Sequence, residues 1–250
     1  MKNKITVREL HVTGYTEPDQ FRSLALPHYA YAFLLEGEVL VEIADKNWLV
    51  GPGQLILVPE NQVISVKHFD GCRGVTGVFS LESLKDASYP VLRSGAPLLQ
   101  SFWFDDAVFM GALFQRMLTA FQDRDKAFLQ SAMDLVLSQI HPSGKVAVIP
   151  EQFLQQVFAK NQIPLSVSEY ASQLQVTPNY LNKTVKHHTH RTAIDWIEIA
   201  RLNLAKQLLK DRTIPVSEVA GRTGIPDQSY FSRFFKKKTG LTPSQYRNGF

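Results

Sequence analysis

Residues 227–247 read DQSYFSRFFKKKTGLTPSQYR, and this stretch decides the fold of the last part of the chain. On a helix that turns by about 100° per residue, its first four aromatic side chains fall within one arc of about 140°. They are Tyr230, Phe231, Phe234 and Phe235. The polar and cationic residues take the opposite side; Pro226 and Asp227 suit the start of a helix, and Gly240 suits its left-handed end. The pattern predicts an amphipathic helix with an aromatic side packed in a core and a basic side facing outward.

The same pattern occurs once before in the chain. VSEYA at 167–171 returns 49 residues later as VSEVA at 216–220. After an insertion of one residue, four positions return at an offset of 50: Tyr180, Lys186, Thr189 and Thr192 recur as Tyr230, Lys236, Thr239 and Thr242. A helical wheel from Pro178 places a second buried side at Tyr180, Leu181, Thr184 and Val185. Each amphipathic helix follows a short apolar helix and a turn, at 175–177 or 224–226, which is helix-turn-helix spacing, twice.

Residues 192–211, TAIDWIEIARLNLAKQLLKD, predict one long helix between the two pairs. About 19 helical residues span roughly 28 Å. This length is close to one turn of DNA, about 34 Å, so we expect the two outward helices to enter successive major grooves on one face.

The outward faces carry side chains that suit DNA. Residues 151–250 hold 14 basic and seven acidic side chains, a net of +7, whereas residues 1–150 hold 13 and 16, a net of −3. Asn and Gln match the donor and acceptor of adenine, and Arg can grip guanine. The residues expected to face bases are Asn179, Asn182, Lys183, Gln228, Ser229, Ser232 and Arg233, and those expected to contact phosphate are Lys186, His187, Lys236 and Lys237. For any one of them a solvated surface is the ordinary explanation; two faces in matching phase within a basic segment favour DNA.

Other residues in this part have simpler interpretations. The three phenylalanines at 231, 234 and 235 are expected to anchor the helix in a core rather than stack on bases. His187, His188 and His190 lack the spacing and partners of a metal site, so structural or phosphate-contacting roles are expected. Lys238 points toward the buried arc and is expected to lay its stem along the apolar surface.

The segments RLNLAKQLL, VSEVAGRTGI and SYFSRFFKKKTGLTPSQYR, in this order, resemble the AraC family of transcription regulators over the last hundred residues. The resemblance implies that paired helix-turn-helix units bind double-stranded DNA, with base-facing roles at the seven positions given above. Three positions depart from the family pattern. His190 stands where the second copy has Gly240, so the first outward helix is expected to end irregularly. Ile225 and Val185 each replace a phenylalanine.

The N-terminal half predicts antiparallel strands over about residues 5–80. Residues 31–69 alternate between apolar and polar and break at Glu36-Gly37, at 44–47 and at 51–53, which is typical of a barrel or sandwich. Helical periodicity follows over about 104–140. The expected organisation is a first domain at 1–141, a linker at 142–150 and a DNA-binding domain at 151–250. The last contains a first unit at about 165–188, a linking helix at about 192–210 and a second unit at about 216–238.

This half is similar, more loosely, to the cupin-like sensor domain of many family members, through LPHYAYAFLLEGEVLVEI and WLVGPGQLILVPE. The resemblance implies a small-molecule effector in a barrel and a homodimer formed through the following helices. A sugar, another metabolite and no ligand at all are the alternatives for the barrel. RNA polymerase is a further candidate partner. Side chains that could line an effector pocket, or equally form plain core, are His28, Tyr29, Tyr31, Phe33 and Trp48. The metal-binding cupin pattern of two close histidines, a glutamate and a later histidine is absent, so no metal is expected.

Composition excludes several classes. One cysteine, Cys72, rules out an internal disulfide and a multi-cysteine zinc site. No apolar run suggests export or membrane insertion, so a cytoplasmic protein is expected. No phosphate loop or nucleophile elbow appears, and neither an enzyme nor a cofactor is expected. Two alternatives stay open: a cupin-type isomerase with a helical appendage, and a protein-binding adapter.

Overall fold

The computed structural model describes residues 4–12, 24–85, 88–93, 101–104, 106–140, 148–159 and 162–249. The chain divides into two compact units, Met1–Val146 and Ala147–Phe250. Most of the expected linker, residues 142–147, lies outside the described residues, and helix α4 begins at Val148.

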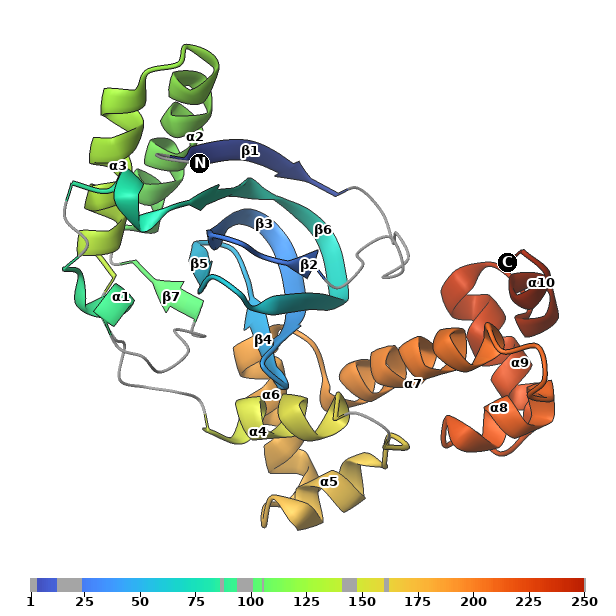
Figure 1. Ribbon diagram of the computed structural model, residues 1–250. Coiled ribbons are helices and arrows are strands. Elements are labelled where there is room, and N and C mark those ends of the chain that lie inside the picture. The colour runs from blue at the N-terminus through green and yellow to red at the C-terminus, as the bar shows by residue number, and fades with distance from the viewer. Residues whose placement is uncertain are drawn as a thin grey trace. The chain divides into compact units, whose positions relative to one another are not determined.

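In the described part of the N-terminal unit, seven strands form one sheet in which every pairing is antiparallel. The strands are β1 (Ile5–His11), β2 (Leu24–Ala25), β3 (Tyr29–Ile43), β4 (Lys46–Val50), β5 (Gln54–Val58), β6 (Val63–Phe79) and β7 (Ser101–Trp103). The path β1-β6-β3-β5-β7 runs through the sheet, with β2 on β6 and β4 on β3. The long strands β3 and β6 curve together through the middle (Figure 1).

The expectation that the strand breaks at Glu36-Gly37 is wrong, because β3 continues through these two residues. The register against β6 shifts on both sides of Glu36, which is the signature of a bulge. Gly37 has φ +74°, and a Cβ there would collide with the backbone oxygen of Asp70. The chain does turn at the other two expected points, where Ala44, Asp45 and Gly53 have positive φ.

The sheet buries side chains on both faces. One face packs with helices α2 (Ala107–Gln122) and α3 (Lys126–Ser138) in a core that includes Phe79 and Phe114. These two helices pack against each other beside β1 (Figure 1). The other face buries a second apolar cluster that includes Leu34 and Phe69. Two short elements, the 3-10 helix η2 (Leu81–Ser83) and α1 (Pro90–Arg93), lie between β6 and β7 in the chain.

The described part of the C-terminal unit is helical. Its helices are α4 (Val148–Val157), α5 (Val167–Gln173), α6 (Pro178–Thr189), α7 (Ala193–Leu209), α8 (Val216–Arg222), α9 (Gln228–Thr239) and α10 (Pro243–Asn248). Within this unit α7 runs as one helix between the group α4 to α6 and the group α8 to α10 (Figure 1). At 17 residues its length is about 25 Å. Among the described helices none combines the length and apolar character needed to cross a bilayer.

Candidate nucleic-acid interface

The two turns that precede α6 and α9 close in the same way. Gln175 and Gly224 both adopt left-handed backbone, with φ of 56° and 76°. The next N–H then reaches back to the preceding helix: Val176 donates to the Ala171 oxygen at 2.9 Å, and Ile225 donates to the Ala220 oxygen at 3.1 Å. The 49-residue offset of the first repeated segment therefore reflects two copies of one turn, and Pro226 is the inserted residue that changes the offset to 50.

Both outward helices are capped alike at their first turn. The Thr177 hydroxyl accepts the Tyr180 N–H at 3.2 Å, and the Asp227 carboxylate accepts the Tyr230 N–H at 2.8 Å. Each cap satisfies a backbone donor that the helix itself leaves open, which fixes where the helix begins.

The expectation that α6 ends irregularly is wrong. His190 takes the left-handed conformation, with φ 59°, and its N–H donates to the Lys186 oxygen at 2.9 Å. Gly240 ends α9 in the same way, with φ 78° and a bond of 2.8 Å to the Lys236 oxygen. Histidine occupies the position at a conformational cost that glycine avoids.

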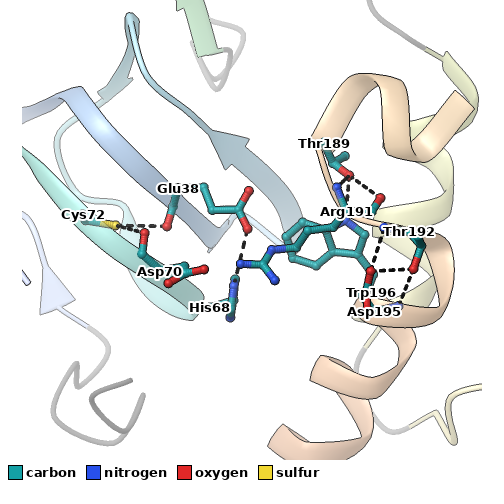
Figure 2. A network of polar contacts seen from close by, with 9 residues as sticks. All are labelled: Glu38, His68, Asp70, Cys72, Thr189, Arg191, Thr192, Asp195 and Trp196. Carbon is teal, nitrogen blue, oxygen red and sulfur yellow. Dashed lines mark hydrogen bonds and ion pairs between the residues drawn. The ribbon is translucent and has the colours of Figure 1, made fainter. Parts of the chain in front are cut away.

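The repeated threonines hold the protein together rather than face outward. The Thr189 hydroxyl donates to the Val185 oxygen at 2.8 Å and accepts the Trp196 indole N–H at 2.9 Å (Figure 2). Thr192 then forms a reciprocal capping box with Asp195 at the start of α7. In the second copy, Thr239 bonds to the Phe235 oxygen and Thr242 caps α10 in a box with Gln245.

Asp195 is held in its charged form by this cap. Partial burial alone would raise the pKa of its carboxyl, but the hydrogen bonds from the Thr192 hydroxyl and N–H, with the charges of Lys238 and Arg191, outweigh burial and lower the pKa. The carboxylate accepts the Thr192 N–H at 2.9 Å. A charged group at the first turn of α7 also interacts favourably with the helix dipole.

The buried sides of α6 and α9 are narrower than expected. Phe231, Phe234 and Phe235 are buried and pack with α7, α8 and α10, and Leu181 and Val185 are buried under α6. The tyrosines of the two helices are not. Tyr180 is 53% exposed and Tyr230 is 52% exposed, so the expectation that they belong to the core is wrong.

Most of the side chains expected to meet DNA lie exposed in the structure. These are Asn179, Lys183, Lys186, His187, Gln228, Ser229, Arg233, Lys236 and Lys237. Among the described residues, none of these side chains makes a hydrogen bond or ion pair within the protein. Such faces leave donors and acceptors open to an outside partner.

Two expected base-facing residues have partners inside the protein. The Asn182 side-chain oxygen accepts the Ala193 N–H at 2.9 Å, which ties α6 to the first turn of α7. Ser232 occupies the matching position of α9, and its hydroxyl donates to the Gln228 oxygen at 2.8 Å. Both side chains are half-buried.

Lys238, whose stem is expected to lie along the apolar surface, has a partner for its charge. Its ammonium forms an ion pair with Glu198 of α7 at 2.6 Å, and both side chains are about one-third exposed, at 36% and 30%. This pair attaches α9 to α7.

Arg201 of α7 joins the two helix-turn-helix pairs. Its guanidinium donates to the backbone oxygens of Pro164 and Leu165 at 3.3 and 3.5 Å, just before α5. The same backbone reaches the second turn, since a Cβ added at Gly224 would lie 3.0 Å from the Pro164 oxygen and 3.3 Å from Ile163. Sequence patterns do not reveal this role, because the contacting residues are 36 and 37 positions apart.

The side chains expected to line an effector pocket do not share one surface. Tyr29, Tyr31 and Phe33 pack in the core with α2, where Phe33 stacks on Phe114 with ring centroids 4.7 Å apart. Burial raises the pKa of Tyr31, whose hydroxyl donates to the Thr6 oxygen. Trp48 packs against the cluster on the opposite face of the sheet, and His28 is half-buried. The packing of the three aromatic residues of β3 fits the plain-core alternative, and a pocket lining stays a prediction. Alternation says which residues share a face but not what covers that face.

Two further side chains of the N-terminal unit with polar atoms, His68 and Cys72, are buried. His68 is buried with its Nε2 3.6 Å from the Glu38 carboxylate, and Cys72 contacts the Glu38 backbone oxygen at 3.0 Å (Figure 2). Burial raises the pKa of Cys72 above its usual value and keeps it a thiol. In the described residues no group of three or more metal-ligating side chains gathers. A separate small cleft of about 110 Å³ is lined by Ile5, Ser83, Lys126, Leu129 and Gln130.

Known proteins are similar to this chain mainly in its C-terminal unit. A family model described as "Helix-turn-helix domain" matches residues 170–249. The chain is 29% identical over 149 residues to YpdC of Escherichia coli K12, described as an uncharacterized HTH-type transcriptional regulator, covering 53% of this chain and 51% of that protein. It is 34% identical over 83 residues to the arabinose operon regulatory protein of the same organism, covering 33% of this chain and 28% of that protein.

A solved structure, the C-terminal domain of AraT, a response regulator from Geobacillus stearothermophilus, is 30% identical. The match covers 43% of this chain and 89% of that one, with a TM-score of 0.39. The chain spans about half or less of the length of the curated relatives named above. The helices and the family match define a protein with two helix-turn-helix units in its C-terminal part. Over residues 170–249 the chain is a helix-turn-helix domain of the AraC type.

Proposed function

We propose that this protein regulates transcription by binding double-stranded DNA, with α6 and α9 in two adjacent major grooves. The observation that carries the proposal is the pair of matched outward faces. Each lies behind the same turn and the same cap, and its exposed side chains have no partners among the described residues. The net charge of +7 over residues 151–250 supplies the attraction to phosphate.

Within this proposal the residues divide by position. In the first two turns of α6 and α9, Asn179, Lys183, Gln228, Ser229 and Arg233 face bases, while Lys186, His187, Lys236 and Lys237 contact phosphate. Asn182 and Ser232 also belong to the base-facing set. A base edge would have to replace their hydrogen bonds to the Ala193 N–H and the Gln228 oxygen.

The test is selection of bound genomic fragments with the purified protein, followed by footprinting. We expect protection of two adjacent major grooves on one face. Asn179→Ala with Lys183→Ala should remove protection of one groove, and Ser229→Ala with Arg233→Ala should remove protection of the other. Arg233→Ala alone should cost about 1 to 3 kcal/mol on the best site if it reads guanine. Protection of a single groove, or none, contradicts the two-unit arrangement.

We also propose a sensory and dimerising role for the N-terminal unit, in which the sheet closes into a cupin-like barrel that holds a small metabolite. The antiparallel sheet with an apolar inner cluster supports this role. Exposed apolar side chains on α2 and α3 support a homodimer: Val108 is 86% exposed, Phe109 48% and Leu135 37%. RNA polymerase is the proposed further partner.

The dimer is tested by sedimentation of the full chain at micromolar concentration. Val108→Asp with Phe109→Ser should shift a dimer to monomer, because both changes place polar groups in an apolar contact. Glu60→Gln, at an exposed position between β5 and β6, is the control. A wild-type protein that is strictly monomeric contradicts the dimer. Effector binding is tested by the thermal shift that sugars and other metabolites produce.

A further inference from the structure

Tyr180 and Tyr230 occupy equivalent positions in the two copies of the repeat, and neither is buried in the core. They are separated by the 50-residue offset of the repeat and are 53% and 52% exposed. Four other large apolar side chains are exposed in the described part of this unit: Val148, Ile163, Ile194 and Leu241. No two of these are related by the repeat offset. Exposure of a bulky ring at the same place in both copies therefore needs an explanation beyond chance surface position.

The repeated threonines and the repeated tyrosines differ in their contacts within the protein. The threonines at 189, 192, 239 and 242 all have hydrogen bonds that end or begin helices. The two tyrosine hydroxyls, by contrast, have no hydrogen-bond partner among the described residues. A ring that stays half exposed gains little from burial within the protein, whereas a partner that covers it would gain its apolar body and its polar tip together.

The backbone at both tyrosines is fixed. Each is the third residue of its helix, and each N–H is held by the capping side chain of Thr177 or Asp227. With the backbone held, a tyrosine has two side-chain torsions to order, so little entropy is lost when the ring meets a partner.

The direction of each ring follows from helix geometry. With the first residue of each helix at zero, the tyrosine lies at about 200° and the residue seven positions later at about 180°. That later residue is His187 in α6 and Lys237 in α9, both exposed. The buried phenylalanines of α9 span about 240° to 340°, so Tyr230 lies at the border between the core side and the outward side.

A helix in a major groove presents the middle of its outward arc to base edges. The borders of that arc face the walls of the groove, where phosphates lie. A hydroxyl at the border, beside a basic side chain, is placed to donate to a phosphate oxygen. Hydrogen bonds to a charged acceptor are about twice as strong as neutral ones.

We propose that Tyr180 and Tyr230 each donate their phenol hydroxyl to a backbone phosphate at the wall of their own groove, next to His187 and Lys237. The two contacts set the depth and register of the recognition helices and carry no sequence information. This inference rests on the proposed function, because it requires α6 and α9 to enter DNA.

The test measures affinity, sequence preference and salt dependence for Tyr180→Phe and Tyr230→Phe. Phenylalanine keeps the ring and removes the hydroxyl, so the fold is retained. Each change should raise the Kd about tenfold, by the same factor on the selected site and on random duplex. The double variant should lose about a hundredfold, because the two sites are on separate helices.

Salt dependence separates the tyrosines from the cations. Neither tyrosine carries charge, so the slope of log affinity against log salt should stay at the wild-type value. Lys237→Gln should reduce the slope by about one, since it removes one released counterion. Tyr89→Phe is the matched control: it makes the same change in the N-terminal unit, where the hydroxyl bonds to Asp134, and should leave the Kd unchanged.

Three results would overturn the proposal. Tyr→Phe variants that bind as tightly as wild type show that the hydroxyls meet nothing. A loss confined to one sequence shows base contact instead of phosphate contact. If the wild-type protein binds neither the selected fragments nor random duplex, the proposed function fails together with this inference, and that result is distinct from the other two.

Discussion

Replacing His190 with glycine should stabilise the C-terminal unit. His190 ends α6 with φ 59°, a conformation that costs a residue with a side chain about 1 to 2 kcal/mol. Glycine removes this cost but gains freedom in the unfolded chain, which offsets about 0.4 to 1 kcal/mol. The imidazole is exposed, so little packing is lost. The net expectation is a rise of about 0.5 to 1 kcal/mol in the free energy of unfolding.

The equivalent position at the end of α9, Gly240, supplies the control. Gly240 has φ 78° and no heavy atom within 4 Å of where a Cβ would stand, so Gly240→His tests backbone conformation without a clash. It should lower the free energy of unfolding by about the same amount. The double variant should then return close to wild type, since the two sites end different helices.

The assay is urea unfolding followed by the fluorescence of Trp196. This indole is buried and hydrogen-bonded to Thr189, one residue before His190, so it reports the structure around the change. Phenylalanine at Trp48 and Trp103 leaves Trp196 as the remaining indole of the chain. A His190→Gly protein that is equally or less stable than wild type would refute the reasoning, because it would mean that the left-handed end carries no strain that glycine relieves.

Three further predictions concern α7. Arg201→Gln should lower the free energy of unfolding by about 1 to 3 kcal/mol, because it removes donors from two backbone oxygens; urea unfolding checks this. The same change should weaken binding to DNA with both half-sites more than binding to DNA with one, which titration of the two DNAs checks. The pKa of Asp195 is lowered, so its cap stabilises the fold fully above about pH 4 and the effect is lost as pH falls through the lowered pKa. Asp195→Asn should therefore flatten the acid limb of a stability–pH curve, and an unchanged limb would contradict the role of the cap. Lys238→Ala should cost less than about 1 kcal/mol in thermal unfolding, because its ion pair with Glu198 is partly exposed.

The sequence predicted the repeated part of the molecule well, because a repeat reports the same geometry twice. It predicted the double helix-turn-helix and the phenylalanines that face inward. It misjudged Tyr180 and Tyr230, because a wheel gives the direction of a side chain but not the width of the buried arc. That width depends on how closely the neighbouring helices approach.

The other differences have the same origin in contacts between distant segments. The bulge at Glu36 and Gly37 exists because β3 pairs with β6, a partner that local pattern does not reveal. Tyr31 and Phe33 alternate as expected, but α2 covers their face of the sheet. His190 accepts the left-handed end because Thr189 and Trp196 fix the chain on both sides of it.

Gly224 makes the two halves of the C-terminal unit non-interchangeable. Its counterpart Gln175 takes the same left-handed backbone with its side chain exposed to solvent. At Gly224 the backbone of Pro164 leaves no comfortable room even for a methyl group. Gly224→Gln should therefore destabilise the unit, because its Cβ would have to displace that backbone by a few tenths of an ångström, whereas Gln175→Gly removes no such contact. The duplication is unequal: the first turn has room for a side chain, and the second has little because an earlier segment of the same unit lies against it.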